Sequence, residues 1–366
     1  MKYITLIYIL CFLCISCTEK KPSNNTFETG VTNYTLKLDY QVRENELFSN
    51  VTKAKILPNN RVLVHDFFEF GVSMFDADGQ FIQRVGNRGR GPQELTRLTD
   101  FASNDNYLFL LDADMRKIVI HNLNDLSFVK DISLEKVDKS IRPEKLISGK
   151  GAGLYVVFYT PFRGGTGNIE RIKHVFKLNT DTGKLLKLDI NAPEDDYYIE
   201  DKGNGITVAD LPFMRRSLFR AYKNRLFFTW TDSMTFHSYI STSETIDTLD
   251  FYFYKRPVLE EDIISHEYYE YLNSKQRKEI EETWPAMENF FVDENTIHVI
   301  TNIPTDNNYT KALVSYSIQK ETEPQVLAKI PENITVIDVK GDTICGIIKE
   351  DPGYKLCIYS LEQSEN

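Results

Sequence analysis

The chain contains the stretch Asn60-Arg61-Val62-Leu63-Val64, in which a polar turn leads into a short apolar strand, and this pattern returns five more times. The later copies are Asn106-Tyr107-Leu108-Phe109-Leu110, Ala152-Gly153-Leu154-Tyr155-Val156, Asn224-Arg225-Leu226-Phe227-Phe228, Asn295-Thr296-Ile297-His298-Val299 and Asp342-Thr343-Ile344-Cys345-Gly346. Their starts are 46, 46, 72, 71 and 47 residues apart. A period near 46 with two stretched intervals is typical of propeller blades with two insertions. The sequence therefore predicts an all-β, six-bladed β-propeller over residues 31–366.

The other strands of each blade are predicted around these copies. An alternating inner strand precedes the copy, as in Val51 to Pro58, Leu95 to Ala102 and Ile334 to Val339, and two further strands joined by a tight turn follow it. The last unit has too few residues left for its fourth strand, whereas Tyr34 to Tyr40 is a spare strand at the N-terminus. We expect this strand to complete the last blade, because closing the ring protects exposed sheet edges.

The composition excludes some classes of protein. Of 366 residues, 42% are hydrophobic and 26% are charged, which is typical of a globular protein rather than a disordered one. The 53 acidic residues exceed the 43 Lys and Arg, so the net charge is −10. This acidic balance argues against a nucleic-acid partner. The 20 Tyr and 23 Phe favour strands, since aromatic rings pack well on pleated sheets.

The N-terminus predicts export. Residues 1–16 carry a basic residue and then an apolar run from Tyr3 to Ile15, which is shorter than the roughly 20 residues of a membrane-spanning helix. The ending Leu13-Cys14-Ile15-Ser16-Cys17 resembles a bacterial lipobox, in which Cys17 would be the lipidated N-terminus; Cys14 stands where Leu is commonest. The alternative is an ordinary signal peptide. We expect a lipoprotein of the cell envelope, in the outer membrane, with residues 17–30 as a flexible tether and the lipid as the contact with the membrane.

Only two cysteines follow Cys17. Cys345 and Cys357 lie on the two arms of a predicted hairpin around Asp351-Pro352-Gly353. A cross-strand disulfide and two buried thiols are both compatible with this pattern, and we favour the thiols. No Cys or His spacing indicates a metal site.

One segment carries a family resemblance. The stretch Gly79-Gln80-Phe81-Ile82-Gln83-Arg84-Val85-Gly86-Asn87-Arg88-Gly89-Arg90-Gly91-Pro92-Gln93-Glu94-Leu95, followed by Leu110-Leu111-Asp112-Ala113-Asp114-Met115-Arg116-Lys117-Ile118, resembles the TolB-like or NHL-like six-bladed propeller lipoproteins of Bacteroidetes. Gln93 departs from the Gly that this family often has there. The resemblance implies an envelope-anchored propeller and no particular activity.

The two faces of the predicted propeller differ. The turns that follow the inner strands are short and polar, such as Asn104 to Asn106, whereas every long connection falls on the other face. The latter include 160–168, 191–212 and 256–285. Since rigid scaffolds display functional residues on loops, we assign binding to the loop-rich face. The region of about 257–285 between blades 4 and 5 is predicted to be a helical insertion, because Ile263, Ile264, Tyr268, Tyr271 and Leu272 follow helical spacing.

Five residues are candidates for ligand contacts, and each also has a structural interpretation. They are Arg88, Arg90, Arg163, Arg216 and Trp284. Arg88 and Arg90 stand in a glycine-rich loop that could hold an anion, or that simply turns between blades with Glu94 pairing with an arginine. The glycine-rich loop of Arg163 lacks the phosphate-loop lysine. Alternation puts Arg215 or Arg216 toward the central channel, where an arginine could bind a carboxylate or pair with Asp100. Trp284 could form an aromatic platform or pack in the core.

The sequence contains no catalytic signature that we could identify. There is no Gly-x-Ser-x-Gly or His-Glu-x-x-His motif, and in His266-Glu267-Tyr268-Tyr269-Glu270 a glutamate replaces the second histidine. Asp76-Ala77-Asp78-Gly79 and Asp112-Ala113-Asp114 begin like calcium loops but lack the later glutamate. We expect turns at these positions, no cofactor, no metal site and no catalytic residue.

Three functions remain open. We expect a monomeric, non-catalytic propeller that binds a small molecule, a glycan or a protein partner on its loop-rich face. The first alternative is a metal-assisted hydrolase, lactonase or lyase that uses carboxylates from several inner strands. The second is a scaffold in an envelope protein complex, which requires a broad apolar patch.

Overall fold

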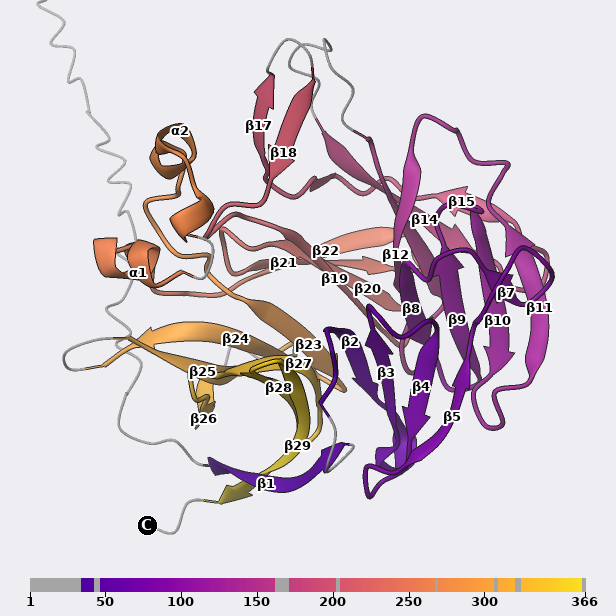
Figure 1. Ribbon diagram of the computed structural model, residues 1–366, viewed down its shortest axis with the longest axis horizontal. Helices are drawn as coiled ribbons and strands as arrows, with labels where there is room; N and C mark the ends of the chain where they lie inside the picture. Colours follow the sequence, from indigo (N-terminus) through magenta and orange to yellow (C-terminus); the bar gives the residue numbers. More distant parts are fainter. Residues whose placement is uncertain are drawn as a thin grey trace, which may run out of the picture.

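The chain folds into six antiparallel sheets around a common axis (Figure 1). The computed structural model describes residues 34–42, 47–161, 171–201, 205–266, 269–305, 309–319 and 324–363. The predicted all-β, six-bladed propeller is confirmed. The predicted signal peptide, Cys17, the tether and Arg163 lie outside the described residues.

Each blade has four strands, here in order from the axis outward. Blade 1 is β2 (Val51–Ile56), β3 (Val62–Asp66), β4 (Val72–Phe75) and β5 (Phe81–Val85); blade 2 is β8 (Asp100–Ser103), β9 (Tyr107–Asp112), β10 (Lys117–Asn122) and β11 (Phe128–Ser133); blade 3 is β12 (Arg142–Ile147), β13 (Leu154–Tyr159), β14 (Ile172–Leu178) and β15 (Leu185–Lys187). Blade 4 is β19 (Ser217–Tyr222), β20 (Arg225–Trp230), β21 (Thr235–Ile240) and β22 (Thr245–Asp250); blade 5 is β23 (Asn289–Asp293), β24 (Thr296–Pro304), β25 (Tyr309–Ser317) and β26 (Gln325–Lys329); blade 6 is β27 (Ile334–Lys340), β28 (Thr343–Glu350), β29 (Gly353–Gln363) and β1 (Tyr34–Val42).

The six sequence copies form the second strand of each blade. These strands are nearly continuous apolar runs, and residues such as Leu63, Phe109 and Val156 are completely buried. A strand that is covered on both faces needs apolar side chains at successive positions, which explains why the copies do not alternate. Apolar clusters fill the space between neighbouring blades, for example Phe109 and Ile120 of blade 2 with Leu154 of blade 3. The core is therefore divided into interfaces between blades.

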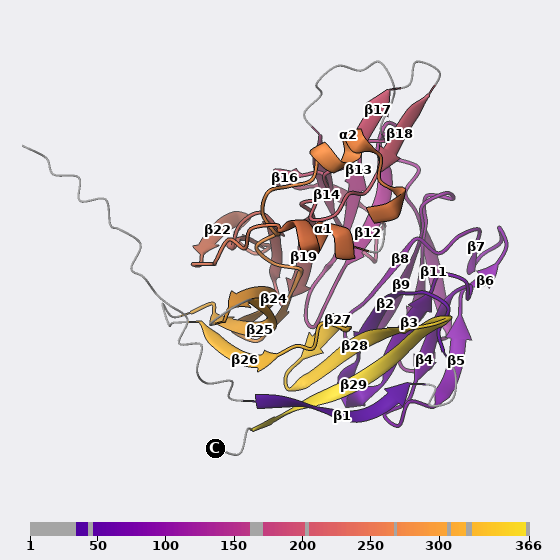
Figure 2. The same ribbon diagram turned by 60° about the vertical axis from the view of Figure 1, so that its left-hand side comes forward.

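The N-terminal strand closes the ring, as the sequence predicts. β1 pairs antiparallel with β29, from Tyr34 opposite Gln363 to Val42 opposite Leu356 (Figure 2). Apolar residues at its end, such as Val42, pack against blade 1. β1 thus joins the first and last parts of the described chain.

One predicted inner strand is wrong at its start. The segment from Leu95 was expected to run into the inner strand of blade 2, but this strand begins at Asp100. Glu94–Leu95 (β7) instead pairs parallel with Asn87–Arg88 (β6). The hydroxyl and the N–H of Thr96 both donate to the carboxylate of Asp112, so this segment is a loop held to the end of β9.

The insertion between blades 4 and 5 is helical only in short pieces. They are α1 (Glu260–Ser265), the 3₁₀ turn η2 (Tyr269–Tyr271) and α2 (Ser274–Lys278). The prediction of a single apolar stripe along this insertion is wrong, because Leu272 is buried but Ile264 and Tyr271 are exposed. The insertion breaks because Asn273 starts a new helix, its side chain accepting hydrogen bonds from Lys275 N–H and Gln276 N–H.

The two long insertions lie side by side. The segment before blade 4 contains β16 (Ala192–Pro193) and a hairpin of β17 (Tyr198–Asp201) and β18 (Ile206–Ala209), which projects beside α2 in both views (Figures 1 and 2). Tyr198 and Leu211 pack on Leu272, and Lys275 Nζ lies 2.8 Å from Glu200 Oε1. The sequence prediction that these long connections share one face is consistent with this contact.

Cys345 and Cys357 are buried free thiols. The register places Cys357 opposite Gly346 rather than Cys345, so the two side chains point to opposite faces of the sheet. The favoured prediction of two thiols is confirmed. Within the described residues, no helix is long and apolar enough to cross a membrane.

Candidate functional site

The inner strands supply the polar side chains nearest the propeller axis. β2, β8, β12, β19, β23 and β27 surround the axis, and neighbouring strands contact one another (Figure 1). Among their residues, Lys53, Lys55, Asp100, Arg220 and Asp338 carry charges. Strand alternation explains their direction: Ser217 and Phe219 of β19 are buried in the blade, whereas Leu218 and Arg220 keep partial exposure.

Asp100 ties three blades together. Its Oδ1 lies 2.7 Å from Lys53 Nζ of blade 1, and its Oδ2 accepts the N–H of Leu146 of blade 3 at 2.8 Å. Both carboxylate oxygens are therefore occupied. The alternative that a channel arginine pairs with Asp100 is wrong, because Lys53 takes this place.

A second charged network lies on blade 3 and the segment that follows it. The ammonium of Lys173, which is 2% exposed, lies 2.7 Å from Glu144 Oε2 and 3.6 Å from Asp195 Oδ1. Lys145 contacts the same two carboxylates at 3.6 and 3.7 Å. Two lysines and two acids balance one another, so this network is neutral and well paired. It is suited to holding β12 and β14 against the chain that leads to blade 4.

Within the described residues, the third group of charges is held by hydrogen bonds rather than by ion pairs. Lys55, Arg220 and Asp338, which we call the axial cluster, come from blades 1, 4 and 6 and interact electrostatically. Lys55 Nζ donates to the backbone carbonyls of Ser103 at 2.7 Å and Ser148 at 3.4 Å rather than to a carboxylate. Within the described residues, neither Lys55 nor Arg220 forms an ion pair. Two cations and one carboxylate form the cluster, and two further carboxylates act on it: Asp105 acts on Lys55, and Asp100, which pairs with Lys53, acts on Arg220.

Burial perturbs every member of the axial cluster. It lowers the pKa of Lys55 to about 8, with the positive charges of Lys53 and Arg220 acting in the same direction and the carboxylates of Asp338 and Asp105 opposing them. It also lowers the pKa of Arg220 and raises the pKa of Asp338. Each side chain nevertheless keeps partial exposure. Perturbed charges that remain accessible are typical of functional sites.

Arg220 is held rigidly by its neighbours. Its guanidinium donates to Asn289 Oδ1 at 2.6 Å and to its own chain at Phe219 O. It also lies over the rings of Phe290 and Phe291, at 5.6 and 5.3 Å from their centroids. Aromatic faces stabilise a cation without neutralising it. Arg220 can therefore present a fixed guanidinium to an anion, although the carboxylates of Asp338 and Asp100 also act on it.

Arg216 and Arg215 have different roles. Arg215 is buried and bound to Asp232 at 2.8 Å and to both oxygens of Thr283, so it joins blade 4 to the insertion. Arg216 is exposed and lies four residues before Arg220. Its positive charge lowers the pKa of Tyr197, against the larger opposite effect of burial. Within the described residues, its guanidinium has no hydrogen-bond or ion-pair partner. Of the predicted ligand contacts, Arg216 is the one that directly precedes an inner strand carrying a member of the axial cluster.

The glycine-rich loop is occupied by its own carboxylate. Glu94 Oε2 accepts the N–H of Gly91 at 2.7 Å and lies where a side chain on Gly89 would have to fit. An anion would have to displace this carboxylate. Glu94 does not pair with an arginine in the described structure, and Arg88 and Arg90 both point to solvent. The loop therefore has a structural role, which the contacts of Glu94 with its glycines explain.

Trp284 is part of the packing of the insertion. The Arg256 guanidinium lies 4.0 Å from its ring centroid, and its indole N–H donates to Asp262 Oδ2 at 3.2 Å. Phe213 contacts the other side, with 4.6 Å between ring centroids. Asp262 also pairs with Arg256 at 2.7 Å. These contacts anchor α1 and leave Trp284 half-buried.

The predicted ligand residues therefore do not form one site. Arg88 and Arg90 lie on the connection between blades 1 and 2, whereas Arg216 and Trp284 lie at blade 4 and the insertion after it. Sequence reasoning missed Lys55 and Arg220. Alternation along β2 and β19 would have indicated them, since both are charged residues at inward positions of inner strands.

No metal donor set is present in the described part of the chain: no three His, Cys, Asp or Glu side chains could jointly hold an ion. Asp76 Oδ1 accepts the N–H groups of Asp78 and Gln80, and Asp112 Oδ1 accepts that of Met115. These aspartates close turns, in agreement with the sequence prediction. His266 contacts the Phe213 ring instead of a second ligand.

Comparisons with known proteins support the fold. A family model described as 6-bladed beta-propeller (DUF5128) matches residues 38–147. No curated protein matches the chain. A solved structure of a candidate exported protein from Bacteroides fragilis superimposes with a TM-score of 0.53 at 14% identity, covering 91% of this chain and 96% of that one. A DUF4221 family member from Bacteroides vulgatus superimposes with a TM-score of 0.50 at 8% identity, covering 92% and 99%. At these identities the likeness concerns the fold alone.

Proposed function

We propose that this protein is a lipid-anchored propeller of the cell envelope that binds, from its loop-rich face, a small molecule with an anionic group. The anion binds between Lys55 and Arg220 at the axis. Binding requires no chemical step and no cofactor. A glycan or a protein partner fits the same proposal if it presents a carboxylate or a similar group.

Two neighbouring cations without a direct ion pair among the described residues, Lys55 and Arg220, carry this proposal. A buried charge without a counter-charge is costly, and a protein that folds for stability alone would replace it with an apolar residue. Lys53 and Lys173 are matched by carboxylates at 2.7 Å, whereas Lys55 is held only by backbone carbonyls. A ligand carboxylate would be a direct ion-pair partner and accept hydrogen bonds from the ammonium and the guanidinium.

Arg216 supports entry from the loop-rich face. Its exposed side chain lies just before β19, at the end of blade 4 that the long connection enters, four residues before Arg220. A charge at the rim attracts an anion before it reaches the inner site.

A matched ligand panel tests this function. Glucuronate is compared with glucose, and succinate with butane-1,4-diol, by thermal shift and titration calorimetry. We expect a carboxylate to raise the melting temperature and its neutral partner to have no effect. Lys55→Met and Arg220→Gln should each abolish the response, whereas Lys130→Gln, at a half-buried lysine on the outer strand of blade 2, should retain it. Lack of response to every carboxylate, or an unchanged response in Lys55→Met, would contradict the proposal.

The anchoring rests on Cys17 and the resemblance to Bacteroidetes propeller lipoproteins. Metabolic labelling with an alkyne fatty acid tests it in a bacterium with the lipoprotein pathway. We expect label on the wild type and none on Cys17→Ala, with the wild type in the membrane fraction. An unlabelled wild type in the soluble fraction would favour the ordinary signal peptide.

A further inference from the structure

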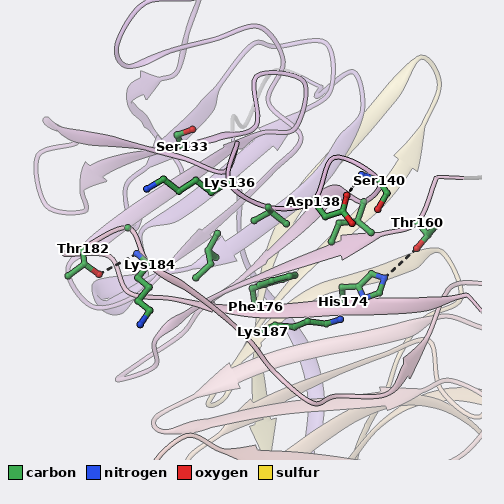
Figure 3. Close-up of a pocket in the computed structure, with 14 residues that line it drawn as sticks. Ser133, Lys136, Asp138, Ser140, Thr160, His174, Phe176, Thr182, Lys184 and Lys187 are labelled. Atoms are coloured by element: carbon green, nitrogen blue, oxygen red, sulfur yellow. Dashed lines mark hydrogen bonds between the residues drawn. The ribbon is translucent and has the colours of Figure 1, made fainter.

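A separate pocket of about 630 Å³ lies on blade 3, beneath the connection from blade 2 (Figure 3). Its walls are the connecting segment 133–141, the strands β14 and β15, and the turn between them at 182–184. None of these residues belongs to the axial cluster. The volume falls in the range of small-molecule sites, about 300–1,000 Å³.

The middle of the pocket is apolar. Val137, Ile141, Phe176 and Leu185 line it. The Phe176 ring is held edge-to-face against Phe158, at 5.1 Å between centroids and 67° between planes. Because Phe158 is fully buried, the position of the Phe176 ring is fixed. A fixed aromatic wall suits a flat, apolar group in the ligand.

The polar lining is predominantly basic. Lys136, Lys184 and Lys187 contribute ammonium groups, and Asp138 is the one acidic residue of the lining. Within the described residues, none of the three lysines forms an ion pair. Asp138 also serves its own loop, since its Oδ1 accepts the N–H of Ser140 at 2.8 Å. A net positive pocket in a chain of net charge −10 opposes the overall charge of the protein.

Donor groups converge at one end of the pocket. The Thr160 hydroxyl and His174 Nε2 lie 3.4 Å apart, and the Lys187 side chain ends beside this pair (Figure 3). Burial, and next the charge of Lys187, lower the pKa of His174, with Asp138 opposing them. An ammonium, a hydroxyl and an imidazole together can surround the oxygens of one anionic group.

From this arrangement we infer that the pocket is a second ligand site, for an anion that carries one or two rings. The anionic group binds at Lys187, Thr160 and His174, and the ring lies along Phe176, Val137 and Leu185. The other lysines increase the local positive potential. This site functions independently of the axial cluster, which is formed by other residues of other blades.

Naphthalene-2-sulfonate is a suitable probe, because it combines both features. Its binding to the full-length protein is followed by its fluorescence and by titration calorimetry, in parallel with inorganic sulfate and 2-naphthol. We expect the sulfonate to bind at least tenfold more tightly than either part alone. Absence of binding at 5 mM, or equal binding of sulfate or 2-naphthol, would overturn the inference.

Matched lysine variants locate the bound probe. Lys187→Gln should weaken binding about tenfold, and Lys184→Gln less. Lys139→Gln is the control: it makes the same charge change on the same connecting segment, but its 81% exposed side chain pairs with Glu135 and does not line the pocket. Equal affinity in Lys187→Gln and the wild type would overturn the inference.

A further variant separates this site from the proposed function. Lys55→Met should bind naphthalene-2-sulfonate as the wild type does, because it removes only the axial charge. Loss of sulfonate binding in Lys55→Met would place the probe at the axis and overturn the second site. The experiments can thus support the second site when the axial proposal fails, and they can support the axial proposal when the second site fails.

Discussion

The carboxylate of Asp338 accepts a hydrogen bond of 2.7 Å from the backbone N–H of Ile56, although the two residues lie 282 positions apart. This bond joins the inner strands of the last and first blades at the axis. The same carboxylate is the only negative charge of the axial cluster. Asp338 therefore connects the closure of the ring to the electrostatics of the proposed site.

Replacing Asp338 should separate these two roles. Asp338→Asn keeps an oxygen acceptor for Ile56 but removes the negative charge, so it should destabilise the fold by about 1–3 kcal/mol and tighten carboxylate binding several-fold. The ligand then no longer competes with Asp338 for Lys55 and Arg220, and only Asp105 and Asp100 remain as carboxylates that act on them. Denaturant unfolding and calorimetry measure both effects. Weaker binding in the folded variant would contradict the charge argument.

Lys55→Met should stabilise the protein while it removes binding. Burial depresses the pKa of Lys55 to about 8 from its usual 10.5, so its charged form is disfavoured in the native state. The apolar replacement relieves a cost of about 1–3 kcal/mol, discounted for partial exposure. The higher free energy of unfolding of Lys55→Met relative to the wild type should be present below pH 8. It should disappear between about pH 8 and 10.5, because there the unfolded wild type binds more protons than the native wild type. Thermal melts at pH 7 and pH 10 compare the two proteins, and destabilisation at pH 7 would refute this expectation.

Carboxylate affinity should depend on pH through Lys55. An anion binds the protonated amine, so affinity should be constant below the Lys55 pKa of about 8 and fall roughly tenfold per pH unit above it. A bound anion raises this pKa, which moves the decline to higher pH in the complex. Lys55→Arg provides the control, because a guanidinium keeps its proton. Titrations from pH 6.5 to 9.5 should show a decline in the wild type and none in Lys55→Arg.

The N-terminal strand should contribute several kcal/mol to stability. A truncated protein that begins at Gln41 loses most of the β1–β29 pairing, which runs from Tyr34 opposite Gln363. Five or so backbone hydrogen bonds at about 0.5–1.5 kcal/mol each predict a loss of about 2.5–7.5 kcal/mol. A protein that begins at Tyr34 keeps the strand and serves as the control. Equal melting temperatures for the two would show that closure adds little.

Trp284→Ala distinguishes packing from recognition. Because the contacts with Arg256, Phe213 and Asp262 are lost, the free energy of unfolding should fall by about 2–4 kcal/mol, and the melting temperature should fall with it. Carboxylate affinity should be unchanged, because Trp284 is not part of the axial cluster. Trp284→Phe, which retains a ring but not the N–H donor, should recover part of the stability. Lost affinity in a folded Trp284→Ala protein would instead support an aromatic platform for the ligand.

Local periodicity made the blades predictable, because each blade repeats one pattern of turn and buried strand about every 46 residues. The count of strands also predicted that Tyr34 to Tyr40 would complete the last blade. The boundaries of elements were predicted less well where individual side-chain contacts, rather than the repeat, determine where an element begins or ends. Thr96 bonds to Asp112 and shortens the inner strand of blade 2, and the capping by Asn273 divides the insertion into short helices.

The sequence by itself determined the number of blades and their closure, since these follow from the spacing of the repeat and the count of strands. It left the state of Cys345 and Cys357 open, because that state depends on the strand register, which places Cys357 opposite Gly346. Only the tertiary structure decided which charges meet. Lys55, Arg220 and Asp338 are far apart in the chain and become neighbours because six inner strands converge on one axis. Whether a charged side chain there is neutralised depends on distances of a few ångströms between different blades. No local pattern encodes those distances, so the axial cluster emerged only from the folded ring.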